Sequence, residues 1–415
     1  MTTRIENTAA EILAFITVWN ENLRAELAGQ EAMSQTDLFR QHPRLLDTNI
    51  LPSAFANWER NRDRASSEVL GFLLQHRVSA EAEAAPLSNV DRLRLCDELS
   101  GRFSGTSYWS LAHDLHQLDA DHTRQLSLDV LASTEDPYAE ACANLGQWRR
   151  PSVIVLQRDL HENITRTANY FDPARILALT DEILAAYAAY SPSVEFISPV
   201  ADTASVVLRF PARAIICSDL RAGREDLRAR LHALGHALDF ALTKTYPAFS
   251  HVFSLVPTET IAFLFQWLTC DRSVVSEEAG AAWERFLFVY FLRRQATLCL
   301  YLDTLAGRDW EPDEKLYRDL MYTYLATDLP SLRARTDLEA RLLPLQFLHA
   351  ADLALKLRHN LERLHGQSWW RKPEAAEAVV PLLRGGTQDR TKVIRNLELC
   401  DASWTHGLTA EGRHP

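Results

Sequence analysis

Glycine is scarce in this chain, which has 14 glycines among 415 residues. Because β folds with many tight turns depend on glycine, this scarcity argues against an all-β protein and favours long helices. No apolar run approaches the roughly 18 residues that a membrane-spanning helix needs, and the N-terminus carries acids before its apolar residues and has no small-residue cleavage site. We therefore expect neither a membrane segment nor a signal peptide.

An excess of basic charge and closely paired cysteines are also missing. The chain has 44 Lys and Arg against 55 Asp and Glu, a net charge of −11, so non-specific binding to nucleic acid is disfavoured. Its 6 cysteines are far apart and form no CxxC motif, which is typical of reduced thiols in a cytoplasmic protein. The sequence also lacks the GxxxxGK[ST] loop, the Rossmann fingerprint and the GxSxG motif. We expect a cytoplasmic protein that binds neither nucleic acid nor membrane; its oligomeric state is left open.

The pattern of apolar residues predicts a mainly α protein. Apolar side chains recur at helical spacing over most of the chain, and only residues 193–217, rich in Val, Ile and Phe, are typical of two or three short strands. We expect a helical domain over residues 1–192 and a second domain over 193–415 that holds the strands. Breaks between helices are expected near residues 79–88 and 133–152.

The segment Arg224–Leu242 carries two candidate metal ligands. Its leucines recur at steps of four, three and four, which predicts a helix with one buried apolar face. His232 and His236 are four residues apart, so their rings project from the same side of that helix and can share one metal ion. The alternative is a pair of histidines that merely border the apolar face.

A second segment, Val256–Leu268, supplies a carboxylate. It is apolar on every side, which predicts a buried helix, and Thr258 after Pro257 is a suitable N-cap. Its strongly polar side chains, Glu259 and Gln266, lie seven residues apart and hence on one face. A buried carboxylate must take a proton or meet a cation, so Glu259 with the two histidines predicts a zinc site with a fourth position for water. The alternative is a glutamate stabilised by the helix dipole and a nearby arginine.

Together, LHALGHAL and PTETIAFLFQWL resemble the zinc site of the thimet oligopeptidase and oligoendopeptidase F family, which are gluzincin metallopeptidases. PARAIICSDL, the helices from FVYFLRR to YTYL, and PLLRGGTQDRTKVIRNLELC are also similar to parts of that family, so the resemblance covers roughly residues 200–400. It implies an elongated helical fold with a deep groove and a small β-sheet beside the zinc helix. It also implies one Zn²⁺ ion with His232, His236 and Glu259 as its ligands.

The chain departs from the family at the catalytic base. The family has a glutamate directly after the first histidine, and this chain has Ala233 there. General acid–base catalysis contributes about 10²–10⁴-fold to a rate, so its loss would leave the site inactive or impaired. Ala233 is compatible with a deliberate Glu-to-Ala change, with a natural inactive relative, or with different chemistry that uses another base.

A second departure concerns the family's tyrosine-rich segment, whose hydroxyls stabilise the oxyanion. The matching stretch is LLPLQFLHAADLALKLRHNL, which carries Gln346 and Phe347 at the tyrosine positions. His349 is then the nearest candidate donor and Asp352 the nearest acid; a satisfied histidine near a helix start is the alternative for His349. Missing donors would remove about 2.7–4 kcal/mol of transition-state stabilisation.

Three further groups of polar residues complete the site predictions. Asp239, in place of the family's third histidine, and Gln266 are expected to orient the ligand imidazoles; an exposed helix face is the alternative for Asp239. His113, His116 and His122 have spacings that a metal can use, but no buried carboxylate helix accompanies them. For these three histidines the sequence favours a solvated helix face.

The function predicted from these residues is zinc-dependent hydrolysis of peptide or amide bonds. The substrate is expected to be a small peptide or another amino-acid-derived molecule whose backbone pairs with the exposed edge of the 206–217 strand region. One alternative is a peptidase scaffold that serves as a zinc enzyme in small-molecule biosynthesis. Another is a non-catalytic pseudopeptidase that binds a peptide or a partner protein.

Overall fold

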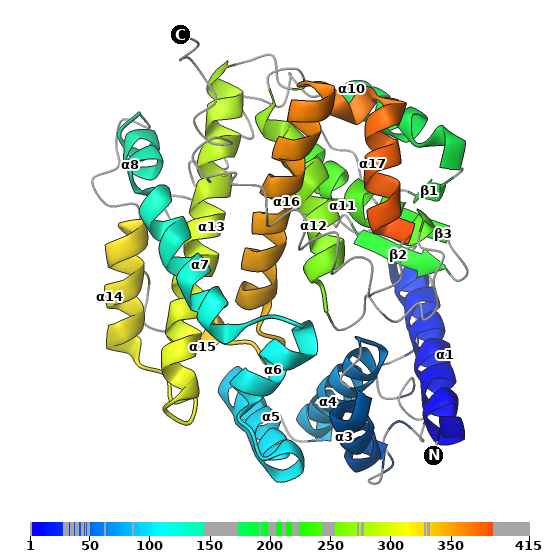
Figure 1. Ribbon diagram of the computed structural model, residues 1–415, viewed down its shortest axis with the longest axis vertical. Helices are drawn as coiled ribbons and strands as arrows, with labels where there is room; N and C mark the ends of the chain where they lie inside the picture. Colours follow the sequence, from blue (N-terminus) through cyan, green and yellow to red (C-terminus); the bar gives the residue numbers. More distant parts are fainter. Residues whose placement is uncertain are drawn as a thin grey trace.

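We describe the protein from a computed structural model. The described residues are 2–384 except 28–32, 34–36, 38–40, 43–44, 46, 48–49, 62–63, 85–86, 145–172, 191, 198–204, 210–212, 218–223, 243–253, 272–273, 275–277, 328 and 330–332. Helices dominate these residues, which confirms the predicted mainly α class (Figure 1). None of the helices among them is both long enough and apolar enough to cross a membrane.

The elements up to the sheet are α1 (Thr2–Leu27), α3 (Ile50–Asn61), α4 (Arg64–Ala84), α5 (Asn89–Ser104), α6 (Tyr108–His116), α7 (Ala120–Ser133), α8 (Glu135–Asn144), α10 (Pro173–Ala186) and the 3₁₀ turn η3 (Ala188–Tyr190). The sheet consists of β1 (Ser193–Ile197), β2 (Ser205–Arg209) and β3 (Arg213–Cys217). After it come α11 (Arg224–Leu242), α12 (Val256–Gln266), η5 (Trp267–Cys270), α13 (Glu278–Ala306), α14 (Glu314–Leu325), α15 (Arg333–Thr336), α16 (Leu343–His365), η6 (Trp369–Arg371) and α17 (Pro373–Arg384).

Side-chain caps fix several helix starts. Ser88 and Asp91 form a capping box at the start of α5, and Asp119 and Asp313 accept backbone N–H groups at the starts of α7 and α14. Such caps satisfy donors that the first turn of a helix leaves without partners. The predicted break at 79–88 is narrower than expected, since α4 continues to Ala84 and α5 begins at Asn89.

The predicted break at 133–152 is wrong in its first part, because α8 occupies Glu135–Asn144, and its second part lies outside the described residues. Its proline lies in the first turn, where a missing N–H costs nothing. The buried Tyr138 then donates a hydrogen bond from its hydroxyl to the carbonyl of Leu325. Arg293 of α13 pairs with Glu135 at 2.6 Å. These tertiary contacts, which the local sequence does not reveal, stabilise α8.

The three strands form one small sheet with the order β1-β3-β2. β1 runs parallel to β3, with Ser193 opposite Arg213, and β2 runs antiparallel to β3, with Ser205 opposite Cys217. The strands contact α11, so the sheet lies beside the helix that carries the two histidines, as predicted. Because β3 is the central strand, the expected edge over 206–217 is wrong for its second half: within the described sheet, β1 and β2 are the edge strands.

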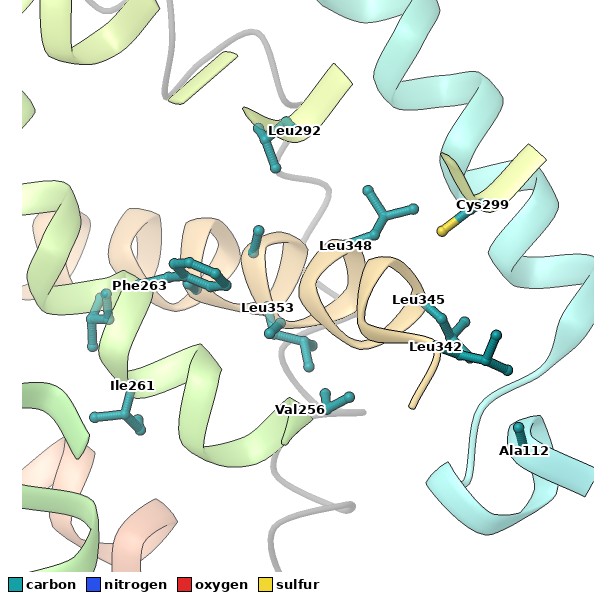
Figure 2. Packing of buried hydrophobic residues seen from close by; sticks show 14 of the residues in the cluster. Ala112, Val256, Ile261, Phe263, Leu292, Cys299, Leu342, Leu345, Leu348 and Leu353 are labelled. Carbon is teal, nitrogen blue, oxygen red and sulfur yellow. The ribbon is translucent and has the colours of Figure 1, made fainter. Parts of the chain in front are cut away.

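One hydrophobic core extends through most of the described helices, and α11, α12, α13 and α16 lie in its middle part (Figure 1). α16 packs along α12 on one side and along α13 on another. Figure 2 shows this packing, with Phe263 and Ile261 on α12 and Leu348 of α16 beside Cys299 of α13. α13 also packs along α7, so helices from both predicted domains contact each other. The division at residue 192, like the deep groove, stays a prediction.

Candidate metal centre

Three side chains from two neighbouring helices meet at one point. His232 and His236 of α11 have their Nε2 atoms 3.1 Å apart, and each Nε2 lies 3.5 Å from an oxygen of Glu259 on α12. Among the described residues, this is the one group of three His, Cys, Asp or Glu side chains close enough to hold a metal ion. The structure therefore brings together the three residues predicted as ligands.

The helical repeat of α11 places its two histidines. Leu227, Leu231, Leu234 and Leu238 are all buried, so the predicted apolar face is present and packs into the core. On the neighbouring side the two imidazoles lie with ring centroids 4.7 Å apart. Their side chains keep 28% and 15% of their surface exposed, so both imidazoles are partly buried.

Gly235 lets α11 and α12 approach closely at this point. A Cβ atom at residue 235 would lie 2.6 Å from the Cα of Ala262 and 2.6 Å from the carbonyl oxygen of Ile261. Such distances are far below ordinary contact and involve backbone atoms, which cannot move aside independently. The glycine between the two histidines is therefore what allows Glu259 to reach them.

Each ligand imidazole is held on its far nitrogen by a side chain of α12. The Nδ1 atom of His232 lies 2.8 Å from Oε1 of Gln266, and that of His236 lies 2.8 Å from the hydroxyl of Thr258. The orienting contact expected of Gln266 is thus present. Thr258 is not the expected N-cap: α12 begins earlier, at Val256, and its N-cap Leu255 makes no side-chain cap.

Asp239 is fully buried on α11, which excludes the exposed-face alternative. The Nδ1 contacts of both histidines go to side chains of α12, and the orienting role expected of Asp239 stays a prediction. The partner of His236 is Thr258, a residue that the sequence suggested only as a helix cap. The sequence signal that could have found this contact is that Thr258 directly precedes Glu259, so its side chain must lie close to the carboxylate ligand.

The hydrogen bonds also set the protonation of His232. The amide oxygen of Gln266 can only accept, so Nδ1 of His232 carries the proton and its Nε2 lone pair faces His236 and Glu259. Burial, with His236 adding to it, lowers the pKa of His232 to about 4. Burial alone would raise the pKa of Glu259, but the contact with His236 and the nearby histidines bring it below its usual value. A neutral imidazole and a carboxylate are the forms that bind metals.

The spacing of these side chains is compatible with a zinc site. Ligand atoms 2.0–2.1 Å from a tetrahedral zinc ion lie roughly 3.3 Å from one another. Here the two Nε2 atoms are 3.1 Å apart, and each lies 3.5 Å from a different oxygen of Glu259, Oε2 for His232 and Oε1 for His236. Without a cation, a lone pair of His232 would face another ring nitrogen and a buried carboxylate. A dication at this point would bind all three groups.

Ala233 provides no group for proton transfer. Its methyl side chain is buried, with 4% of the residue exposed, in the position directly after the first ligand. The ring of Phe263 stands on another side of His232, with its centroid 5.6 Å from that of the imidazole. The ring of Phe263 in turn contacts the rings of Phe291 and Phe347. Phe347 occupies one of the expected tyrosine positions but has no hydroxyl.

The other residues from the tyrosine-like segment point elsewhere. His349 is buried, and its Nε2 lies 2.9 Å from the hydroxyl of Thr123 on α7, so the alternative of a satisfied histidine holds. Burial and the nearby His122 lower its pKa to about 3. Asp352 pairs with Lys356 of the same helix at 2.8 Å. Neither contact is directed to the candidate metal centre.

His113 of α6 and His349 of α16 form a buried network around Thr123. Nδ1 of His113 donates to the carbonyl of Trp109, and its Nε2 lies 3.2 Å from the Thr123 hydroxyl. His113 and His116 are each only 3% exposed, so the expected solvated face is wrong for both, although His122 is exposed. The packing of α6 against α4, α5 and α13 explains this burial.

Comparisons with known proteins support the fold. No family model and no curated protein sequence matches the chain. Among solved structures, the chain is similar to the M32 carboxypeptidase from Deinococcus radiodurans R1, with a TM-score of 0.53, 12% identity and 98% of each chain covered. At this identity the likeness shows a shared fold, which confirms the expected helical metallopeptidase-like architecture.

Two further structures show weaker likeness. One is assigned as an oligoendopeptidase F from Bacillus anthracis str. Ames, with a TM-score of 0.49, 12% identity, and coverage of 86% of this chain and 67% of that one. The other is Trypanosoma cruzi metallocarboxypeptidase 1, with a TM-score of 0.43, 11% identity, and coverage of 88% and 75%.

Proposed function

We propose that the protein is a zinc-dependent hydrolase of the metallopeptidase type that acts on peptide or amide bonds of a small, amino-acid-derived substrate. The observation that carries this proposal is the convergence of His232, His236 and Glu259 within 3.5 Å of one another. The metallopeptidase fold of the chain supports it. Location in the cytoplasm and the absence of nucleic-acid and membrane partners stay predictions.

The chain's own residues divide the work of such a site. A zinc ion bound there would polarise the substrate carbonyl and acidify a water molecule. Gln266 and Thr258 fix the orientation of the two imidazoles and keep their Nε2 atoms directed at the ion. Phe263 excludes water from one side of His232. Ala233 cannot accept a proton, so the chain with this residue is expected to hydrolyse peptides slowly or not at all.

A non-catalytic pseudopeptidase is the second candidate, and Ala233 is the observation that favours it. Such a protein would keep the metal and the fold, bind a peptide or partner, and release it unchanged. A zinc enzyme of small-molecule biosynthesis is the third possibility, consistent with Gln346 and Phe347 at the tyrosine positions. All three share the metal centre and differ in what happens to the bound molecule.

Two measurements test the proposal. Elemental analysis of the purified protein should find about one zinc per chain, and the His232→Ala protein should lose it; equal metal content in both would rule out the site. An Ala233→Glu protein should then cleave members of a mixed peptide library. Zinc binding without cleavage after this substitution would contradict the hydrolase proposal and leave the binding and biosynthetic alternatives.

A further inference from the structure

The start of α12 is anchored by hydrogen bonds to side chains of other helices. Its N-cap residue, Leu255, has helical backbone angles and receives no side-chain cap, and Pro257 in the first turn has no N–H to donate. The N–H of Leu255 instead donates to Oε1 of Gln346, a residue of α16, at 2.7 Å. One residue earlier, the N–H of Ser254 donates to the carboxylate of Glu68 on α4 at 3.3 Å.

Gln346 is built into the core to make this contact. It is 0% exposed, and its amide nitrogen donates to the carbonyl of Arg341 at 2.8 Å. That second bond fixes which end of the amide faces Leu255, because the nitrogen is already committed to an acceptor. A fully buried amide with both ends bonded has one orientation and little freedom to move.

The hydrogen bond between Leu255 and Gln346 is linked to the carboxylate ligand, Glu259, through the first turn of α12. The N–H of Glu259 donates to the carbonyl of Leu255 at 2.8 Å, so the residue that Gln346 anchors is bonded directly to the residue that carries the carboxylate. A shift of Leu255 would therefore move Glu259. Metal–ligand distances tolerate deviations of only about 0.2 Å, so a small shift is enough to weaken binding.

We propose that Gln346 is a positioning residue for the metal centre: by anchoring the N–H of Leu255 it fixes the first turn of α12 and holds the Glu259 carboxylate at the two imidazoles. The inference rests on the proposed zinc site. It gives a role to a residue that replaces an expected tyrosine, and the role is exerted through the backbone of α12 rather than on a substrate.

The test compares zinc affinity with stability in matched variants. Gln346→Met keeps the size of the side chain and removes both hydrogen bonds. Gln75→Met is the control, because Gln75 also bridges two groups, the Tyr108 hydroxyl and the Ala340 carbonyl, without contact to α12. The dissociation constant of Zn²⁺ is measured by competition with a chromophoric chelator, stability by urea unfolding of the metal-free protein, and ligand geometry by the visible absorption of bound Co²⁺.

We expect Gln346→Met to weaken Zn²⁺ binding about tenfold, the lower end of the range for residues that orient ligands, and to change the Co²⁺ spectrum. Gln75→Met should lose stability but keep the zinc affinity and the spectrum of the original protein. Gln346→Glu retains an oxygen acceptor for Leu255 but loses the donor to the Arg341 carbonyl, so it should recover only part of the affinity. In a Glu259→Gln background, Gln346→Met should have no further effect, because the group it positions no longer binds the ion.

Each other outcome overturns a defined part of the reasoning. Unchanged zinc affinity in Gln346→Met, or an equal loss in the Glu259→Gln background, would show that Gln346 does not act through Glu259. If Gln346→Met fails to fold, Gln346→Asn, which keeps the amide but is one methylene shorter, takes its place with the same expectations. If the unaltered protein binds no Zn²⁺, the proposed function itself fails, independently of Gln346.

Discussion

Replacement of Gly235 by alanine should separate the two helices that form the metal centre. The new Cβ would lie 2.6 Å from the Cα of Ala262 and from the carbonyl oxygen of Ile261, whereas non-bonded carbon atoms prefer about 3.5–4.0 Å. Since both neighbours are backbone atoms, α11 and α12 must move apart by about 1 Å to relieve the overlap. Glu259 belongs to α12 and moves with it.

The expected energies follow from two opposing effects. Overpacking of a well-packed core costs about 1–3 kcal/mol, while alanine in place of glycine within a helix contributes about 1 kcal/mol in favour of folding. The net change in the free energy of unfolding is therefore a loss of at most about 2 kcal/mol. The larger effect falls on zinc, because a displacement of about 1 Å exceeds the tolerance of about 0.2 Å in ligand distances.

Urea unfolding of the metal-free protein and competition with a chelator measure the two effects separately. Gly101→Ala is the matched control: Gly101 lies within α5, and nothing is within 4 Å of the position its Cβ would take. This variant should gain about 0.5–1 kcal/mol of stability and keep its zinc affinity. If Gly235→Ala bound zinc as tightly as the unaltered protein, the close approach of α11 and α12 would not be what holds the site together.

Three other predictions follow from side-chain contacts and burial in the structure. Thr258→Val should weaken Zn²⁺ binding about 10–100-fold, whereas Thr258→Ser, which keeps the hydroxyl beside His236, should bind nearly normally in the same chelator assay. Arg293 bonds two backbone carbonyls, Thr134 and Glu135 from within the core, so Arg293→Met should cost about 3 kcal/mol in urea unfolding, and the exposed Arg308→Met less than about 0.5. The pKa of His349 is about 3 in the folded protein against 6.5 for an ordinary histidine, so the unfolded chain binds more protons between these values and stability falls as pH drops from 6.5 towards 3. His349→Gln should reduce this slope by up to about 1.4 kcal/mol per pH unit, and an unchanged slope would show that His349 is not held neutral.

The local sequence of α11 was enough to place His232 and His236 on one side of a helix, next to its apolar face. A helix repeats every 3.6 residues, so leucines at helical steps and histidines four apart must share their respective faces whatever surrounds them. The helix Arg224–Leu242 has the predicted bounds. Glu259 could be added because a carboxylate in an otherwise apolar helix needs a cation or a proton, which is a statement about solvation and not about a particular neighbour.

Contacts between distant segments decided the rest. Thr258 turns to His236 instead of capping its own helix, and Gln346 contacts Leu255 across 91 residues of sequence. His349 forms a hydrogen bond with Thr123, which lies 226 residues away in the sequence, and is therefore not directed at the metal centre as an oxyanion donor would be. The periodicity of a helix specifies which of its side chains lie on the same face. It carries no information about which other helix packs against that face, and hydrogen bonds between helices depend on that packing.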